Sequence, residues 1–483
     1  MYPKGRHLAR AILFTILVAS VATPTFGQKF FPAEANGVAD YYIVLLDPGI
    51  TDPEEEAEKL TTKFGGQVTF IYRELYPGFE AEMDEQTAMA MAASPSVKSI
   101  HQDSWFVLED ALSAPVDWCY QSPTNTNQRP LPSIPPCGGS SSCPQGLFCP
   151  QPGGDPCIDN WGLDRIDQLQ WLAPLDQVFN YRGAGTGVTV YTIDGGIHGS
   201  NREFLRGTSM SRVEPGVDAS KGCVLPCPPA TQNCCDPPSE TCCPLTGNHD
   251  CVVGHGTHVA GIIGGRTFGV AKDVTLVPMR FASLYQDPPT PPCLNNLAAL
   301  AQLSGLNRSL EFILQLHPAS APTAVVNMSL NDPSARWADV NISSTQFVRD
   351  SMIALASRDN ILIVQSAGNQ GRSGTTDPPP GGMFPGDACA FTFGDESRYS
   401  GSDASAIARI VIVAGFDPDL GQFDAGPLLA TNWGPCVDIW APASDIVSAG
   451  GHVDDPVDNR ICRLTGTSMA APHVSGVAAL LLE

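Results

Sequence analysis

Basic residues are scarce in this chain relative to acidic ones. Of its 483 residues, 27 are lysine or arginine and 50 are aspartate or glutamate, which gives a formal net charge of −23. Such a balance argues against nucleic acid and against an anionic membrane as partners. The surplus of carboxylates is compatible with structural calcium and with secretion, although plain solubility is the better explanation of it.

Long apolar runs are also missing. The stretch Ala11–Ala19 follows three basic residues and precedes small ones, and it is shorter than the roughly 20 residues that cross a bilayer. This pattern is typical of a secretory signal peptide, here over residues 1–27. We therefore expect an exported protein without a membrane span.

Zinc-type cysteine spacing is absent, although cysteine itself is abundant. The 16 cysteines include no CxxC pair and no histidine spaced as a companion ligand, which leaves zinc as the weaker interpretation. In an exported chain such cysteines indicate disulfides. Most of them lie in residues 111–157, a linker rich in Pro, Gly and Ser, and in a second insertion at residues 223–251.

A small hydroxyl residue stands at the start of an apolar helix near the C-terminus. The block Gly466–Gly476 leads into Val477–Leu482, which has no polar face and therefore predicts a helix buried on all sides. Ser468 at its start has backbone N–H groups and the positive end of the helix dipole beside it. That environment favours a nucleophile, with a plain loop before a core helix as the alternative.

Two upstream blocks supply the base and the orienting group that a serine nucleophile needs. Gly254–Gly261 places His255 just before an apolar run that predicts another buried helix, with His258 as a structural histidine. Val188–Gly196 is a β-branched strand ending in Asp194 at a glycine turn, the end at which parallel sheets carry their chemistry. The chain order is therefore Asp, His, Ser.

The rest of residues 158–483 repeats an α/β rhythm. Continuous apolar strands alternate with helical spacing, which predicts a parallel sheet with helices on both faces. Residues 40–110 form a smaller α/β unit in the order strand, helix, strand, helix, strand. In the larger part the expected strands include Val274–Val277, Ala324–Met328, Ile361–Val364 and Ile410–Val413, and the expected helices include Leu294–Leu316 and Thr345–Arg358.

The three blocks around Asp194, His255 and Ser468 resemble the signatures of the subtilisin-like serine proteases. The stretches Trp161–Asp167 and Asn432–Ile439 point to the proteinase K branch. The resemblance implies that the serine attacks the peptide carbonyl, the histidine carries the proton and the aspartate orients the imidazole.

Two further positions near the catalytic blocks matter under this resemblance. Asn369 matches the side chain that, with the Ser468 backbone N–H, forms the oxyanion hole, although an Asn capping a glycine turn is the alternative. Gly195 departs from the family, which has Ser or Thr after the catalytic aspartate. We expect weaker positioning there and retained activity.

The substrate main chain is expected to pair with two exposed strand edges, which leaves side-chain preference to pockets. Phe391 resembles the aromatic residue of the primary pocket, and Gly368 leaves that pocket open, so apolar or aromatic residues are expected before the cut. Asn331 and Asp332 replace two glycines of the family and alter the upstream subsites. The two edges correspond to Ser329, Leu330 and Asn331, and to Ser366, Ala367 and Gly368.

The resemblance also implies two disulfides and one calcium ligand. Cys389 and Cys436 resemble one pair, and Cys251 and Cys293 another, with pairing inside the cysteine islands as the alternative. Asp438 stands where the branch uses a carboxylate for structural calcium. No cofactor is expected for the chemistry itself.

Residues 40–110 look like the inhibitory prosegment of these proteases, with a ferredoxin-like domain that has its own binding role as the alternative. The prediction is a secreted endopeptidase that acts on proteins or peptides and is made as a self-processed precursor, cut between Asp110 and Asn160. The alternative function is a Cys-rich binding or adhesion protein on a protease-derived scaffold. Because relatives continue beyond the position of Glu483, we also expect a truncated C-terminus.

Overall fold

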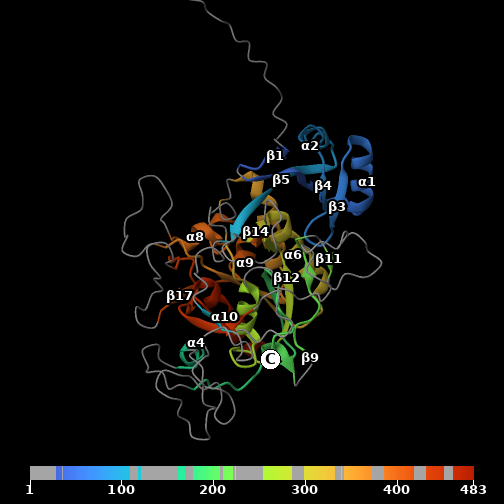
Figure 1. The fold of residues 1–483 in the computed structure, drawn as a ribbon. Coiled ribbons are helices and arrows are strands. Elements are labelled where there is room, and N and C mark those ends of the chain that lie inside the picture. The colour runs from blue at the N-terminus through green and yellow to red at the C-terminus, as the bar shows by residue number, and fades with distance from the viewer. Residues whose placement is uncertain are drawn as a thin grey trace, which may run out of the picture.

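The computed structural model describes residues 29–34, 36–108, 118–120, 161–168, 178–206, 210–220, 223–224, 254–284, 299–331, 339, 342–371, 386–417, 431–450 and 461–483. The predicted signal peptide, most of both cysteine islands, and Cys251 and Cys293 lie outside these residues. A small N-terminal unit rests on a larger C-terminal one (Figure 1). In the described part, no helix combines the length and the apolar character that crossing a membrane requires.

The larger unit is built on a sheet that, among the described residues, has the order β11-β10-β12-β7-β15-β16-β17-β18. All neighbours are parallel except β10 and β11, so the predicted parallel sheet is confirmed. The strands are β7 (Thr189–Asp194), β10 (Val217–Asp218), β11 (Cys223–Val224), β12 (Thr275–Arg280), β15 (Ala324–Met328), β16 (Ile361–Ser366), β17 (Ile410–Phe416) and β18 (Ile439–Pro442).

Helices cover both faces of this sheet, because successive side chains of a strand point to opposite faces and both sets are apolar here. In β7, Val190 packs into one cluster with Ile263, and its neighbour Tyr191 packs into another with Leu310. The predicted cover on both faces is thus confirmed. The first face carries α5 (His255–Gly264) and α10 (Thr467–Leu482), and the second carries α6 (Leu303–Leu316), α7 (Gln346–Ala356) and α9 (Gly401–Ile407).

The N-terminal unit is built on five strands, with β1 beside β5 and the order β5-β2-β4-β3. Aspartates cap both of its helices: Asp52 accepts from the Glu55 N–H and Asp84 from the Thr87 N–H. Strand β4 was not predicted. It contains Glu80, and a charged residue in a sequence indicates an exposed position, whereas Glu80 is fully buried in the structure. The elements are β1 (Phe30–Phe31), β2 (Gly37–Leu46), α1 (Pro53–Phe64), β3 (Gln67–Tyr72), β4 (Gly78–Glu82), α2 (Glu85–Ala92) and β5 (Val97–Leu108).

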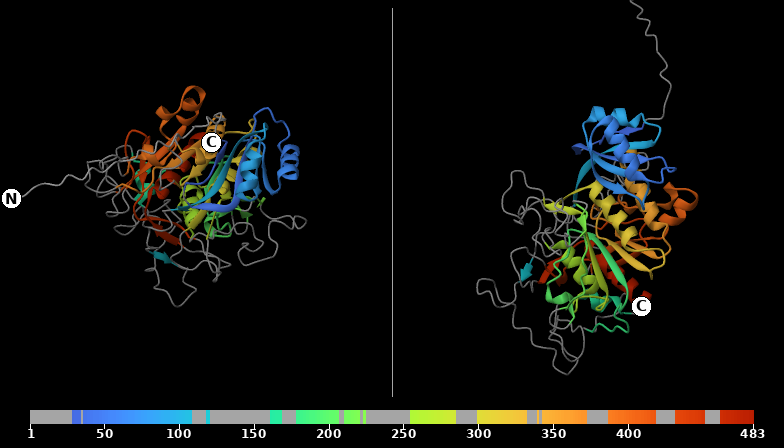
Figure 2. Two further views of the ribbon diagram at one scale, coloured as in Figure 1. Left: turned by 90° about the horizontal axis from the view of Figure 1, so that it is seen from above. Right: turned by 90° about the vertical axis from the view of Figure 1, so that its right-hand side faces the viewer.

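One expected helix is wrong in its first part. The structure begins α6 at Leu303 and places strand β14 (Ala299–Gln302) directly before it, within the stretch Leu294–Leu316. This strand pairs on one side with β13 (Ala282–Leu284) and on the other with the end of β5. Pairing with distant strands therefore overrides the local helical spacing. The N-terminal sheet thereby continues onto the larger unit and lies against α6 (Figure 2).

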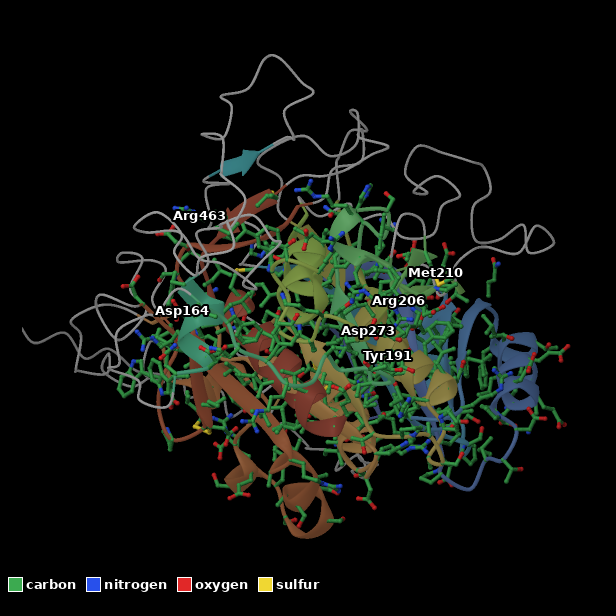
Figure 3. All side chains as sticks on the ribbon, turned by 90° about the horizontal axis from the view of Figure 1, so that it is seen from below. Asp164, Tyr191, Arg206, Met210, Asp273 and Arg463 are labelled. Atoms are coloured by element: carbon green, nitrogen blue, oxygen red, sulfur yellow. A yellow bond between two sulfur atoms is a disulfide. The ribbon has the colours of Figure 1, made fainter. Side chains whose placement is uncertain are left out.

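Shorter elements complete the described chain. Arg206 at the end of β8 forms an ion pair with Asp273, at 2.7 Å, which ties that strand to the turn before β12 (Figure 3). The remaining elements are β6 (Trp118–Tyr120), α4 (Trp161–Ile166), η1 (Arg202–Phe204), β8 (Leu205–Arg206), β9 (Met210–Ser211), η2 (Ser343–Thr345), α8 (Ala388–Phe391), η3 (Glu396–Arg398), β19 (Ile446–Ala449) and β20 (Ile461–Leu464).

Candidate active site

A buried carboxylate and a buried imidazole meet at the carboxyl edge of the parallel sheet. Asp194 is the last residue of β7, and His255 is the first residue of α5. The Nδ1 atom of His255 lies 3.0 Å from both carboxylate oxygens of Asp194. Because a carboxylate only accepts hydrogen bonds, Nδ1 carries the proton and Nε2 is left as the basic nitrogen of the ring.

Glycines bring these two side chains together. A Cβ atom on Gly256 would lie 2.2 Å from the Gly196 carbonyl oxygen and 2.9 Å from Asp194 Oδ1, so only glycine fits beside His255. The Gly195 N–H donates to Asp194 Oδ1 at 2.7 Å. At the position where the chain lacks the family's hydroxyl, the backbone thus supplies a hydrogen bond that orients the carboxylate.

Ser468 lies at the same edge of the sheet. It is the second residue of α10, which packs against α5. Its Oγ donates to the Ser329 carbonyl oxygen at 3.2 Å, and Ser329 Oγ donates to the Ser468 carbonyl oxygen at 2.9 Å. Ser329 directly follows Met328, which is paired with Ile193, the residue before Asp194. The structure thus places all three predicted residues around one edge of β7 and β15.

Asn369 is held next to the serine by a residue that the sequence argument overlooked. Its Oδ1 accepts from the Thr467 N–H at 3.0 Å and from Thr467 Oγ1 at 3.1 Å. Thr467 Oγ1 in turn accepts from the Gly368 N–H at 3.1 Å. With Oδ1 engaged in this way, the amide nitrogen is the end of Asn369 that can face a ligand. A hydroxyl residue at the first position of the helix was the available signal for this role.

The two predicted substrate edges are the segment just beyond β15 and the segment that begins at Ser366, the last residue of β16. The pairing of β15 with β16 ends at Met328 and Gln365. The segments Ser329–Asn331 and Ser366–Gly368 follow these two residues. The side chain of Gln365 then spans the gap by donating to the Leu330 carbonyl oxygen at 3.4 Å. Open α/β sheets bind ligands in the crevice outside the carboxyl ends of their strands, and these two segments flank that position.

A third edge, strand β14, was missed because its residues were assigned to a helix. The Phe281 N–H donates to the Asp194 carbonyl oxygen at 3.0 Å, and the β13–β14 hairpin begins at the next residue. The outer side of β14 is paired with the end of β5, where Leu108 faces Ala299 and Trp105 faces Gln302. The last strand of the N-terminal unit therefore occupies the outer edge of β14, whose other neighbour, β13, begins one residue after the contact of Phe281 with Asp194.

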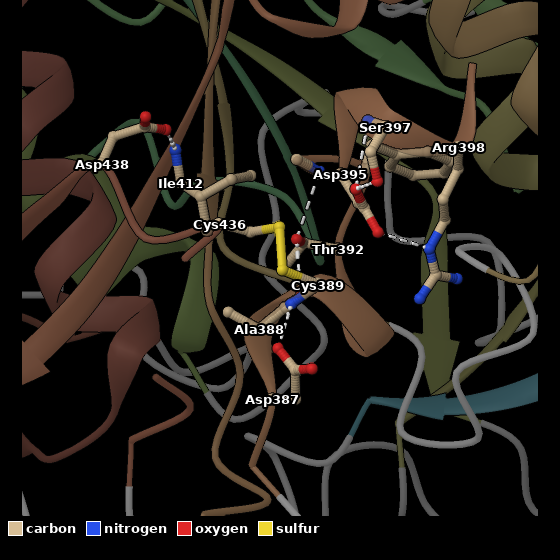
Figure 4. The surroundings of a disulfide bond; sticks show 12 residues. Asp387, Ala388, Cys389, Thr392, Asp395, Ser397, Arg398, Ile412, Cys436 and Asp438 are labelled. Carbon is tan, nitrogen blue, oxygen red and sulfur yellow. Dashed lines mark hydrogen bonds and ion pairs between the residues drawn. A yellow bond between two sulfur atoms is a disulfide. The ribbon is translucent and has the colours of Figure 1, made fainter. Parts of the chain in front are cut away.

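The predicted pocket aromatic, Phe391, is the last residue of α8 and is half-buried. The described hydrogen bonds link this region to the crevice through Phe393, whose N–H donates to Gln365 Oε1 at 3.1 Å. Cys389, also in α8, forms a disulfide with Cys436 (Figure 4). That bond fixes α8 to the segment that leads into β18.

Asp438, the predicted calcium ligand, accepts from the Ile412 N–H at 2.8 Å and lies exposed (Figure 4). Among the described residues, the group of side chains close enough to share a metal ion is Cys389, Asp395 and Cys436, whose cysteines are already joined. Asp438 is not a member of this group, and calcium there stays a prediction.

Two other histidines near the site are buried and structural. His258 Nε2 lies 3.0 Å from the Ile446 carbonyl oxygen, and burial lowers the pKa of this histidine to about 3. His473 Nδ1 lies 2.8 Å from the Met469 carbonyl oxygen, and burial lowers its pKa to about 4. Both stay neutral at physiological pH, which fits a structural role for each.

Comparisons with known proteins agree with this geometry. A family model described as the Subtilase family matches residues 185–483. The chain is 32% identical over 324 residues to the "Extracellular serine proteinase" of Thermus sp. (strain Rt41A), covering 67% of the chain and 57% of that protein. It is 27% identical over 464 residues to the "Alkaline serine exoprotease A" of Vibrio alginolyticus, covering 92% and 61%.

A solved structure shows the same fold over most of the chain. Fervidolysin from Fervidobacterium pennivorans, a keratinolytic enzyme related to subtilisin, matches with a TM-score of 0.54 and 17% identity, over 94% of this chain and 57% of that one. The chain therefore spans about three fifths of the length of these three proteins.

Proposed function

Because the chain belongs to the subtilase family, we propose that it is a serine endopeptidase acting through Asp194, His255 and Ser468. The observation that carries this proposal is the contact of His255 Nδ1 with both oxygens of Asp194, at 3.0 Å, on the sheet edge where Ser468 begins its helix. Asp194 orients the imidazole and stabilises its positive charge when it takes up a proton.

The reaction follows from these positions. Ser468 Oγ attacks the peptide carbonyl carbon while its proton passes to His255 Nε2. The negative oxygen of the tetrahedral intermediate faces the first N–H groups of α10 and the Asn369 amide. The C–N bond then breaks as His255 donates its proton to the leaving amine, and water repeats the sequence to release the acid.

The N-terminal unit is proposed to be an inhibitory prosegment. Its last strand adds to the exposed edge of β14 by main-chain pairing, the mode by which extended peptides bind to sheet edges. Buried polar contacts support this docked position. Glu311 of α6 accepts from the N–H groups of Arg73, Glu74 and Leu75 at 2.9 to 3.0 Å, in the loop after β3.

Cleavage between Asp110 and Asn160 is proposed to separate this prosegment from the catalytic unit. Export from the cell is supported by the apolar N-terminal stretch and by the extracellular relative. N-terminal sequencing of the active enzyme tests the cleavage. A mature N-terminus at or before Tyr41 would show that residues 40–110 are not an inhibitor, and would favour the binding-domain interpretation.

Labelling with a fluorophosphonate, followed by mapping of the adduct, tests the catalytic proposal directly. We expect the label on Ser468, and we expect Ser468→Ala to lose casein hydrolysis by roughly six orders of magnitude, the figure known for subtilisin. Ser475→Ala is the matched control, because Ser475 lies on the same helix and its Oγ donates to Asn327. Unlabelled, inactive wild-type protein with a binding activity that survives Ser468→Ala would instead support the adhesion alternative.

A further inference from the structure

Side-chain amides bridge the crevice between the segments that follow β15 and β16. Asn331 Nδ2 donates to Gln370 Oε1 at 3.1 Å, and Asn432 Nδ2 donates to the same oxygen at 2.6 Å. The Gln370 N–H donates back to Asn432 Oδ1 at 2.9 Å. Asn331 is 3% exposed and Asn432 is fully buried, so these amides form a fixed part of the crevice wall.

The bridge lies directly over Gly368. A Cβ atom on this glycine would come within 1.8 Å of Asn331 Nδ2, 2.5 Å of Gln370 Oε1 and 2.6 Å of Asn432 Nδ2. Gly368 also has a φ of +95°, which disfavours other residues. The space beside the glycine is therefore occupied by three amide groups.

The nucleophile lies at the inner end of the same crevice. Ser468 Oγ donates to the Ser329 carbonyl oxygen, and the Gly368 N–H donates to Thr467 Oγ1, so both walls contact the start of α10. A substrate carbonyl at Ser468 directs the side chain of its own residue between these walls. From Ser329 to Asn331 an extended chain covers at most about 7 Å, which is within the reach of an aromatic side chain.

We propose that Asn331 acts as a polar bar that closes the primary specificity pocket to large side chains. This inference rests on the proposed peptidase function. It assigns a preference for Gly, Ala or Ser before the scissile bond, because a larger apolar group would collide with the bridge or separate its amides. A separated buried amide loses its hydrogen-bond partner, which is unfavourable in the enzyme–substrate complex.

The bar changes the expectation of an apolar or aromatic preference. That expectation assumed that Gly368 leaves the pocket open. The sequence showed that Asn331 replaces a glycine of the family, but it did not show that the Asn331 side chain lies over Gly368. Asn331 itself is the specificity determinant in this structure, and Gln370 is the residue that positions it.

The test compares two peptide anilides that differ only in having Ala or Phe before the scissile bond. The enzyme is expressed as the full chain and used after its own processing. For the wild type, kcat/KM for the Ala substrate should exceed that for the Phe substrate by at least ~10-fold. Asn331→Ala should shift this ratio toward Phe by at least ~10-fold, and Gln370→Ala should shift it in the same direction by less. Both Asn331→Gly and Asn331→Ala remove the amide, but only Asn331→Gly adds backbone freedom. Comparing the two variants therefore separates these effects.

Each outcome decides the proposal. A wild-type enzyme that prefers Phe, or a ratio unchanged in both Asn331→Ala and Gln370→Ala, would overturn the polar bar while leaving the peptidase assignment intact. If Asn331→Ala does not fold or process, the Gln370→Ala ratio decides. If neither anilide is cleaved and the wild type takes no fluorophosphonate label, the proposed function fails and the bar fails with it.

Discussion

Buried carboxylates appear in two regions of this molecule with different partners. At the proposed catalytic centre, Asp194 is bonded to an imidazole and to the Gly195 N–H. At the interface of the N-terminal unit, Glu80 forms an ion pair with Arg308 at 3.0 Å, with both side chains almost fully buried. A guanidinium stays charged at all relevant pH values, whereas an imidazole gains and loses a proton. The pairing of Glu80 with Arg308 holds two surfaces together, and the pairing of Asp194 with His255 is suited to proton transfer.

The interface carboxylate is also more completely bonded. The hydroxyl groups of Tyr41 and Tyr72 donate to Glu80, and burial together with this carboxylate raises the pKa of both tyrosines, so both stay protonated donors. Arg308 in turn donates to the Ala219 carbonyl oxygen at 2.6 Å. A buried charge pair stabilises a complex only when its remaining donors and acceptors are satisfied in this way. The comparison therefore predicts that each region can be disabled without the other.

The largest effect should come from breaking the catalytic centre alone. Asp194→Asn presents an amide to His255 Nδ1 and so favours the tautomer with the proton on the wrong nitrogen. We expect kcat to fall by roughly 10⁴, as for the equivalent change in other serine proteases. Binding of a fragment covering residues 29–108 should stay within about threefold of wild type. Loss of fragment binding in Asp194→Asn would show that the two regions are coupled.

The next effect should come from breaking the interface alone. Glu80→Gln, made in the 29–108 fragment, removes the carboxylate that contacts the buried Arg308 guanidinium. Removing one partner of a buried pair costs about 3–5 kcal/mol, so the inhibition constant should rise by roughly 10² to 10³ or more. Glu82→Gln is the matched control, since Glu82 lies on the same strand and is exposed. Equal inhibition by both variants would contradict the role given to the ion pair.

Much of this architecture was predictable from the sequence because the signal is local. The strand Ala324–Met328 and the helix starts near His255 and Ser468 depend on continuous apolar runs, and the structure places them where they were expected. Strand β14 was missed because its residues also fit a helix, and only the distant strand β5 decides between the two. Pairing between residues far apart in the chain is invisible to a local pattern.

The same limit applies to the site. Asp194, His255 and Ser468 stand in blocks that resemble those of the subtilisin-like proteases, and this resemblance predicted that they lie together. The bar of Asn331 and Gln370 depends on a contact between loops that follow different strands, and nothing in either loop alone indicates it. Thr467 was overlooked for a related reason, because its link to Asn369 becomes visible only when β16 and α10 are packed together.

Docking of the N-terminal unit should depend on pH through Asp103. This buried interface carboxyl accepts hydrogen bonds from the N–H and the Oγ of Ser304 in the larger unit. Burial raises its pKa from 3.8 to about 6, against the hydrogen bonds from Ser304, and nearby Glu80 raises it further while Arg308 lowers it. Release returns this carboxyl to water, so docking takes up a proton. Docking is therefore strongest below pH 3.8 and weakens as the pH rises through about 6.

The expected change for this single group is roughly a hundredfold between pH 4 and pH 7. The measurement is the inhibition constant of the 29–108 fragment across this range, for wild type and for Asp103→Asn. The ratio of the two constants isolates Asp103 from other titrating groups, and it should change by about that factor. A ratio that is constant with pH would show that the carboxyl keeps an ordinary pKa when docked.

The smallest effect should come from the exposed part of the same interface. Lys98 Nζ lies 3.3 Å from Asp350 Oδ2, but the lysine side chain is half exposed, so solvent and salt screen the pair. Exposed ion pairs contribute about 0.2–1 kcal/mol, so Lys98→Ala in the fragment should raise the inhibition constant by less than about fivefold, and 0.5 M salt should remove the difference. The Glu80→Gln effect should persist at that salt concentration, because buried pairs are screened much less. If both effects vanished together in salt, the interface would be held by surface charge, and the distinction drawn between its buried and exposed contacts would be wrong.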